Sequence, residues 1–144
     1  MKKIIIALIM SLFMFSFKYN EDIFIGSWKI IGLKHSSIIW NSNKLQKKYI
    51  GKIIVIQKDK FTAPFFQDKC ETYSREVKKY TYDDFEVYMK VKPNKDLKIS
   101  ESSIIYIVDF NCITSDGFIF VYDSTKSQYY IFYDGAYYKV VKDR

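Results

Sequence analysis

The strongest constraint on the fold is the alternation of side chains in the last third of the chain. In residues 104–112 (IIYIVDFNC), the even-numbered positions all carry apolar side chains, whereas the odd-numbered positions mix apolar and polar side chains. A two-residue period is typical of a β-strand, whose successive side chains point to opposite faces of a sheet. Asp134-Gly135 separates two further tyrosine-rich runs, and this dipeptide favours the tight turn of a β-hairpin. This part of the chain therefore predicts antiparallel strands.

The first half of the chain continues the pattern. Residues 23–33 and 51–57 are apolar runs of strand length, and Pro64 limits the run over 61–66 to an edge or bulged strand. Residues 36–49 differ, because their apolar side chains recur every three to five positions. That spacing predicts a short helix or a lid-like loop after the first strand.

The composition supports one fold class for the whole body of the chain. With 13 Tyr and 12 Phe, the chain is rich in aromatic side chains, which favour pleated, half-buried surfaces. About eight short strands, with turns roughly every ten residues, are typical of a barrel or a sandwich. We predict an all-β protein with a single antiparallel β-barrel domain over residues 18–144.

Residues 86–92 carry two conflicting signals. Val87, Met89 and Val91 alternate with polar or tyrosine side chains, which favours a strand. Phe85 and Met89 lie four positions apart, a spacing that leaves a helix open. We expect a strand here.

The N-terminus has the order of charges and apolar residues found in secretory signal peptides. Lys2 and Lys3 precede an apolar run over residues 4–17 that only Ser11 and Ser16 interrupt. As a helix this run would reach about 21 Å, which is short of the roughly 30 Å hydrocarbon core of a bilayer. We predict that residues 1–17 are a signal peptide that is removed, and that the protein is exported to the periplasm or secreted, without a membrane span. A retained N-terminal anchor and a buried N-terminal helix are the alternatives.

The two cysteines, Cys70 and Cys112, fit an exported protein. In an oxidising compartment, a pair of cysteines in a small domain usually forms a disulfide. This one would close a loop of about 43 residues and contribute roughly 4 kcal/mol in the chain-entropy estimate. Two free buried thiols or a reactive cysteine are the alternatives, but the chain has no C-x-x-C motif.

The residue inventory excludes most catalytic and metal sites. His35 is the only histidine, so a site with several histidine ligands is excluded, and we expect His35 in a surface loop. The five glycines are scattered and form no phosphate-binding loop. Asp83, Asp84 and Glu86 lack the glycine of a calcium loop and are expected in an exposed turn. We predict no catalytic residue, no metal and no cofactor. An enzyme that uses Asp or Glu with Tyr inside the barrel is the remaining alternative.

The net charge is positive but not concentrated. It is +7 for the whole chain and +5 without Lys2 and Lys3, with 21 basic against 16 acidic residues. The lysines are scattered and form no run dense enough for a nucleic-acid-binding arm. We therefore expect no nucleic-acid partner and a solvated basic surface. An acidic partner or an anionic envelope surface is the alternative.

Gly26-Ser27-Trp28 opens the first predicted strand. This G-x-W motif resembles the start of the barrel in lipocalins and lipocalin-like proteins. The resemblance implies a lipocalin-like barrel in which Gly26 and Trp28 have a structural role at one barrel end. It also implies that the tryptophan packs near a basic residue of the last strand. Lys139, Lys142 and Arg144 are available for that role, and we predict Arg144 as the structural residue at this barrel end.

These observations favour a binding function. A small barrel offers an interior for a small apolar ligand and an aromatic rim for a protein, and tyrosine suits both because its ring is apolar and its hydroxyl is polar. We predict an exported, monomeric, non-enzymatic binding protein. An inhibitor or immunity protein that blocks a secreted hydrolase or toxin is the alternative. The candidate contact residues are aromatic side chains on the last hairpin and before the second strand: Trp40, Tyr129, Tyr130, Tyr133, Tyr137 and Tyr138.

Overall fold

The computed structural model describes residues 21–36, 47–65, 70, 73–112 and 117–144. The predicted signal peptide, Trp40 and most of the predicted helix or lid after the first strand lie outside the described residues. Within the described ranges, no helix is both long enough and apolar enough to cross a membrane.

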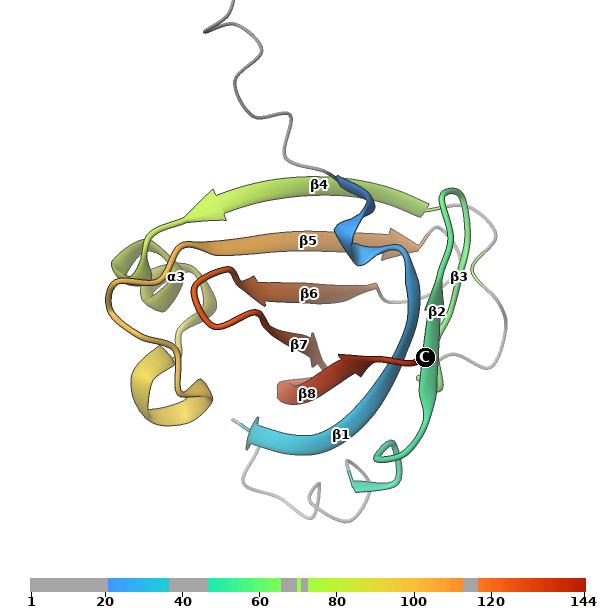
Figure 1. Ribbon diagram of the computed structural model, residues 1–144, viewed down its shortest axis with the longest axis horizontal. Coiled ribbons are helices and arrows are strands. Elements are labelled where there is room, and N and C mark those ends of the chain that lie inside the picture. Colours follow the sequence, from blue (N-terminus) through green and yellow to red (C-terminus); the bar gives the residue numbers. More distant parts are fainter. Residues whose placement is uncertain (1–20, 37–46, 66–69, 71–72, 113–116) are drawn as a thin grey trace, which may run out of the picture.

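Eight strands form one antiparallel sheet that curves into a nearly closed barrel (Figure 1). Every neighbouring pair consists of strands that follow one another along the chain, except β1 and β8, which join the two ends. The predicted all-β barrel is therefore confirmed. The strands are β1 (Gly26–Ser36), β2 (Ile53–Ile56), β3 (Phe61–Thr62), β4 (Tyr73–Tyr80), β5 (Ile105–Cys112), β6 (Phe118–Asp123), β7 (Gln128–Tyr133) and β8 (Ala136–Lys142).

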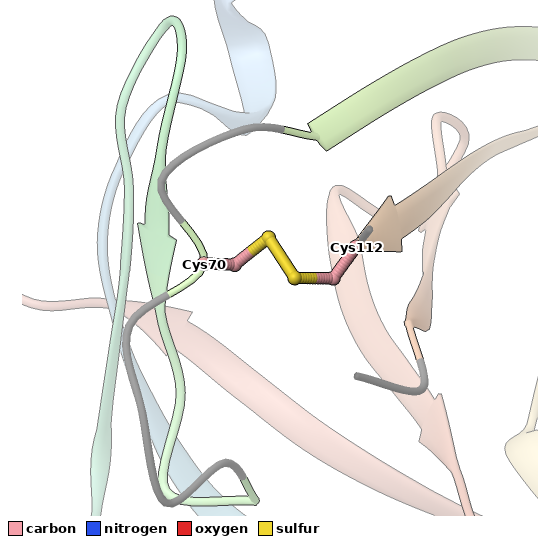
Figure 2. Close-up of a disulfide and its surroundings, with 2 residues drawn as sticks. All are labelled: Cys70 and Cys112. Atoms are coloured by element: carbon pink, nitrogen blue, oxygen red, sulfur yellow. A yellow bond between two sulfur atoms is a disulfide. The ribbon is translucent and has the colours of Figure 1, made fainter. Parts of the chain in front are cut away.

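The barrel has one seam, between β3 and β4, where no continuous ladder forms. Phe61 and Cys70 exchange two backbone hydrogen bonds there, at 3.0 and 3.1 Å. The Tyr73 hydroxyl donates to the carbonyl of Gln57 across the same seam. The predicted disulfide, Cys70–Cys112, then ties the segment after β3 to the end of β5 (Figure 2). A covalent bond and a few contacts thus join the two sides of the seam near the start of β4.

Side chains from the inner face of the barrel form one apolar core, called here the inner core. It joins seven of the eight strands to the short 3-10 helix η1 (Glu21–Phe24). Most of its bulk is aromatic, and its largest buried side chains are Phe24, Trp28, Phe61, Phe110, Phe118, Phe120 and Tyr138.

A second core, called here the outer core, lies on the opposite face of β5–β8. The helix α3 (Tyr82–Met89) and the π-helical turn η2 (Pro93–Leu97) cover this face. Ile107 belongs to the outer core and its neighbour Val108 to the inner core, because successive residues of a strand face opposite sides. Both faces of this half of the sheet are therefore buried.

The predicted strand over residues 86–92 is wrong, because most of the segment belongs to α3. Thr81 caps the helix by accepting a hydrogen bond from the Asp84 backbone N–H at 3.3 Å. Phe85 is fully buried in the outer core, whereas Val87 is 77% exposed. The helical spacing from Phe85 therefore decides which residues are buried, and the alternation of Val87 with its neighbours is incidental.

Candidate functional site

One end of the barrel is built around the G-x-W motif. The Trp28 indole N–H donates to the carbonyl of Phe24 at 2.8 Å, which fixes η1 across this end. Lys142 Nζ lies 5.7 Å from the centre of a Trp28 ring, within reach of a cation–π interaction. Gly26 has φ +135°, and a Cβ there would lie 3.1 Å from Lys142 Cε. The positive φ favours glycine at this position, and a larger residue would also shift the end of the Lys142 side chain slightly.

Lys142 is thus the basic residue at the Trp28 ring. Arg144 lies beyond the end of β8 and is exposed.

The first strand was predicted to begin at residue 23. It begins three residues later, at Gly26, because residues 21–24 form η1.

Three tyrosines form a stack beside Trp28 on the inner face of the sheet. Tyr106, Tyr122 and Tyr129 occupy directly paired positions on β5, β6 and β7. Their ring centres are 6.2 Å apart for Tyr106–Tyr122 and 4.6 Å for Tyr122–Tyr129, with interplanar angles of 26° and 15°. The Tyr129 ring lies 4.6 Å from that of Trp28. We call Tyr106, Tyr122 and Tyr129 the tyrosine ladder.

The tyrosine ladder is only half-buried, unlike the aromatic side chains below it. Burial raises the pKa of Tyr129, and the charge and hydrogen bond of the neighbouring Tyr122 hydroxyl raise it further. The Tyr129 hydroxyl therefore remains neutral at neutral pH and can both donate and accept hydrogen bonds. The ladder offers apolar ring surface and polar hydroxyls together, which is a combination found at protein contact sites.

A lysine lies at each end of the tyrosine ladder. Lys79 of β4 pairs with Tyr106 in the β4–β5 register and is exposed. Lys142 lies over Trp28 at the other end. The arrangement therefore suits a partner that combines apolar or aromatic groups with negative charge.

The interior behind the tyrosine ladder is occupied by rings in contact. Phe120 lies 4.9 Å from Trp28 and 5.0 Å from Phe24, measured between ring centres. Further along the barrel, Phe118 lies 4.9 Å from both Phe61 and Phe110. A ligand on the ladder would therefore rest on a layer of packed rings.

No protein-family model, curated protein or solved structure matches this chain.

The predicted contact residues divide between the surface and the two cores. Tyr130 and Tyr137 are buried in the outer core and Tyr138 in the inner core, so these three present no contact surface. Tyr129 and Tyr133 are half-buried. Tyr133 stacks on Phe65 at 4.2 Å between ring centres, at a distance from the ladder along β7.

Sequence reasoning missed Tyr106 and Tyr122 as site residues. Each belongs to a predicted strand, and Tyr106 shares its phase with Val108. This alternation indicates that Tyr106 lies on the same face of the sheet as Val108. The pairing of Tyr106 with Tyr122, however, depends on the strand register, which the sequence alone does not supply.

His35 is not in a surface loop as predicted. It lies in β1 and is half-buried, and its Nδ1 is 3.4 Å from Asp96 Oδ1 of η2. The pair lines an open hollow of about 430 Å³ together with residues of α3 and the segment after it: Glu86, Lys90, Val91, Lys92 and Lys95. The lining contains neither a hydroxyl nor a thiol nucleophile. Within the described ranges, no group of three His, Cys, Asp or Glu side chains is placed to hold a metal ion.

The acidic residues expected in an exposed turn instead begin α3. Asp83 and Asp84 lie in its first turn, where a negative charge interacts favourably with the helix dipole. These two carboxylates therefore stabilise the start of α3.

Alkaline pH is expected to unfold the protein through its buried tyrosines. Burial raises the pKa of Tyr130 to about 12 and raises those of Tyr137 and Tyr138 as well. An unfolded tyrosine ionises near pH 10, so the folded state binds more protons above that pH. The stability that these hydroxyls contribute is complete below pH 10 and is lost as the pH rises towards about 12.

A titration followed by tyrosinate absorbance and circular dichroism checks this prediction. The last tyrosines should ionise together with the loss of the β-sheet signal. Ionisation of all tyrosines near pH 10 in a protein that keeps its circular dichroism would contradict it.

Proposed function

We propose that this chain is an exported, non-enzymatic binding protein that contacts a partner protein through the tyrosine ladder. The proposal is carried by one observation: three stacked tyrosines stay half-buried on the inner face while the rings beneath them are closed to solvent. Tyrosine contributes large contact area with little loss of side-chain entropy, so stacked tyrosines are effective anchors for a partner. Removal of residues 1–17 during export is part of the proposal.

A protein partner fits this geometry better than a small apolar ligand inside the barrel. A ligand-carrying barrel typically encloses a cavity of about 300 Å³ or more. Here the aromatic side chains Trp28, Phe61, Phe110, Phe118 and Phe120 meet one another across the interior. Binding at the surface of this layer requires no rearrangement of those rings. The resemblance of Gly26 and Trp28 to the lipocalin motif agrees with a structural role for this end of the barrel.

The substitution Tyr122→Ser tests the proposal. Tyr122 is the central ring of the ladder, so its removal separates Tyr106 from Tyr129. Captures from an envelope extract with the wild-type protein and with the variant should differ by at least about tenfold in the amount of partner recovered, which corresponds to the loss of one anchor side chain.

Val87→Ser is the control, because Val87 also lies outside the ladder, on α3, and is 77% exposed. It should recover as much partner as the wild type, provided that both variants keep the wild-type circular dichroism. Equal recovery by Tyr122→Ser and the wild type would rule out the ladder as the contact site.

A further inference from the structure

Strand β4 is an edge strand eight residues long. It forms a ladder with β5 along its whole length, and the strand order ends there. In an antiparallel ladder, alternate residues direct their N–H and C=O groups to opposite sides of the strand. Half of the residues of β4 therefore direct their backbone groups away from β5, and in the described part of the chain no strand ladder receives them.

The seam closes only at the start of β4. β3 has only two residues. Phe61 of β3 forms the backbone bridge with Cys70, and its ring centre lies 5.3 Å from that of Tyr73 at the start of β4. Figure 1 shows β2 and β3 at the Tyr73 end of β4, while the end that leads into α3 has no strand beside it on the seam side. Among the described residues, the second half of β4, from Val77 to Tyr80, therefore has no strand paired to its seam side.

The charges of β4 select what can pair with it. Its charged residues are Arg75, Lys78 and Lys79 with a single acid, Glu76, which gives a net charge of +2. Lys78 and Glu76 form an ion pair at 3.0 Å, so the excess positive charge comes from Arg75 and Lys79. Lysines on an edge strand disfavour edge-to-edge pairing with another copy of the chain. The same charges favour an incoming strand that is acidic.

We propose that β4 docks an extended acidic segment of the partner protein, which adds to the sheet as a further strand on the seam side. This inference rests on the proposed function, because it specifies how the partner reaches the tyrosine ladder. Backbone pairing of this kind supplies affinity, while alternate side chains supply specificity.

The position of β4 connects its edge to the tyrosine ladder. Val77 and Lys79 share the inner face with their partners Val108 and Tyr106. A strand added about 4.8 Å from β4 would direct every second side chain to the same inner face, next to Val77 and Lys79. Acidic side chains at those positions would lie beside Lys79, and larger apolar ones would reach Tyr106.

A synthetic eight-residue peptide of alternating glutamate and valine tests the docking. Amide hydrogen exchange, measured by NMR on the full chain, should show new protection in β4 when the peptide is added. A peptide methylated on two adjacent central backbone nitrogens, which blocks both of its edges, should bind at least about tenfold more weakly. A lysine–valine peptide of the same length should give no protection. Unchanged exchange in β4, or equal binding of the methylated peptide, would overturn the proposal.

Charge-reversal variants provide the matched pair on the protein. Lys79→Glu should weaken binding of the glutamate–valine peptide by about tenfold or more. Lys47→Glu, which makes the same charge change at an exposed residue before β2, should have a much smaller effect. Equal weakening by the two variants would show a response to net charge only and would contradict docking at β4.

The peptide experiment also separates this inference from the proposed function. If Tyr122→Ser loses the natural partner while the peptide fails to protect β4 in the wild type, the ladder is the contact site and docking at β4 is wrong. If the peptide protects β4 in both the wild type and Tyr122→Ser, but Tyr122→Ser keeps its partner, docking at β4 stands and the ladder is not the contact site.

Discussion

Replacing both Cys70 and Cys112 by alanine is expected to lower the free energy of unfolding by about 4 kcal/mol. The disulfide joins residues 42 positions apart, and opening that loop restores its closure entropy to the unfolded chain. The native barrel also loses the covalent bond beside its only seam in the described sheet, where Phe61 and Cys70 form an isolated bridge. Urea denaturation followed by circular dichroism measures the change.

Reduction provides the control for this prediction. Wild-type protein in excess reductant should approach the stability of the double alanine variant, whereas the variant itself should not respond to reductant. A double variant within about 1 kcal/mol of the oxidised wild type would contradict a structural role for the disulfide.

Trp28→Ala is expected to destabilise the protein by about 3–5 kcal/mol, as is usual for removal of a large buried aromatic side chain. Trp28 is 1% exposed and contacts Phe120 and Tyr129, and its N–H holds the carbonyl of Phe24. The substitution therefore leaves a cavity and also releases η1. Denaturant unfolding gives the magnitude.

Trp28→Phe separates the two effects. It restores part of the ring volume but not the N–H donor, so its stability should fall between those of the wild type and Trp28→Ala. Val87→Ala, at a position on α3 that is 77% exposed, should stay within about 0.5 kcal/mol of the wild type. Equal stability of Trp28→Ala and Val87→Ala would contradict the placement of Trp28 in the inner core.

The strands were predictable wherever the chain carries its own local signal. The alternation over residues 104–112 and the turn at Asp134-Gly135 correspond to β5 and to the β7–β8 hairpin. The disulfide was predictable for a different reason, since only two cysteines are present and a single pairing is possible. The strand signals depend on neighbouring residues, and the disulfide depends on the number of cysteines. Both can be read directly from a sequence.

The features that were missed depend on contacts between distant parts of the chain. The alternation of Val87 with Met89 indicated a strand, but burial of Phe85 against the outer face of the sheet favours α3. The tyrosines Tyr130, Tyr137 and Tyr138 suggested an exposed rim because a hairpin with two tyrosine-bearing faces was expected to leave one of them in solvent. Coverage of the outer face by α3 and η2 buries Tyr130 and Tyr137, and nothing in the hairpin itself indicates that cover. Tyr138 lies on the other face and is buried in the inner core.

The pairing of β1 with β8 has a consequence for how the protein folds. Every other ladder joins strands that are neighbours along the chain, so those hairpins can form as soon as their residues are available. β1 can pair with β8 only after Ala136–Lys142 have been synthesised, and Lys142 follows its partner Trp28 by more than a hundred residues. Until then Trp28 lacks its contact with Lys142. Closure of the barrel is thus the contact with the largest loop-closure cost, and we expect it to limit the folding rate. A newly made chain would stay open, with β1 unpaired on that side, until its last strand is complete.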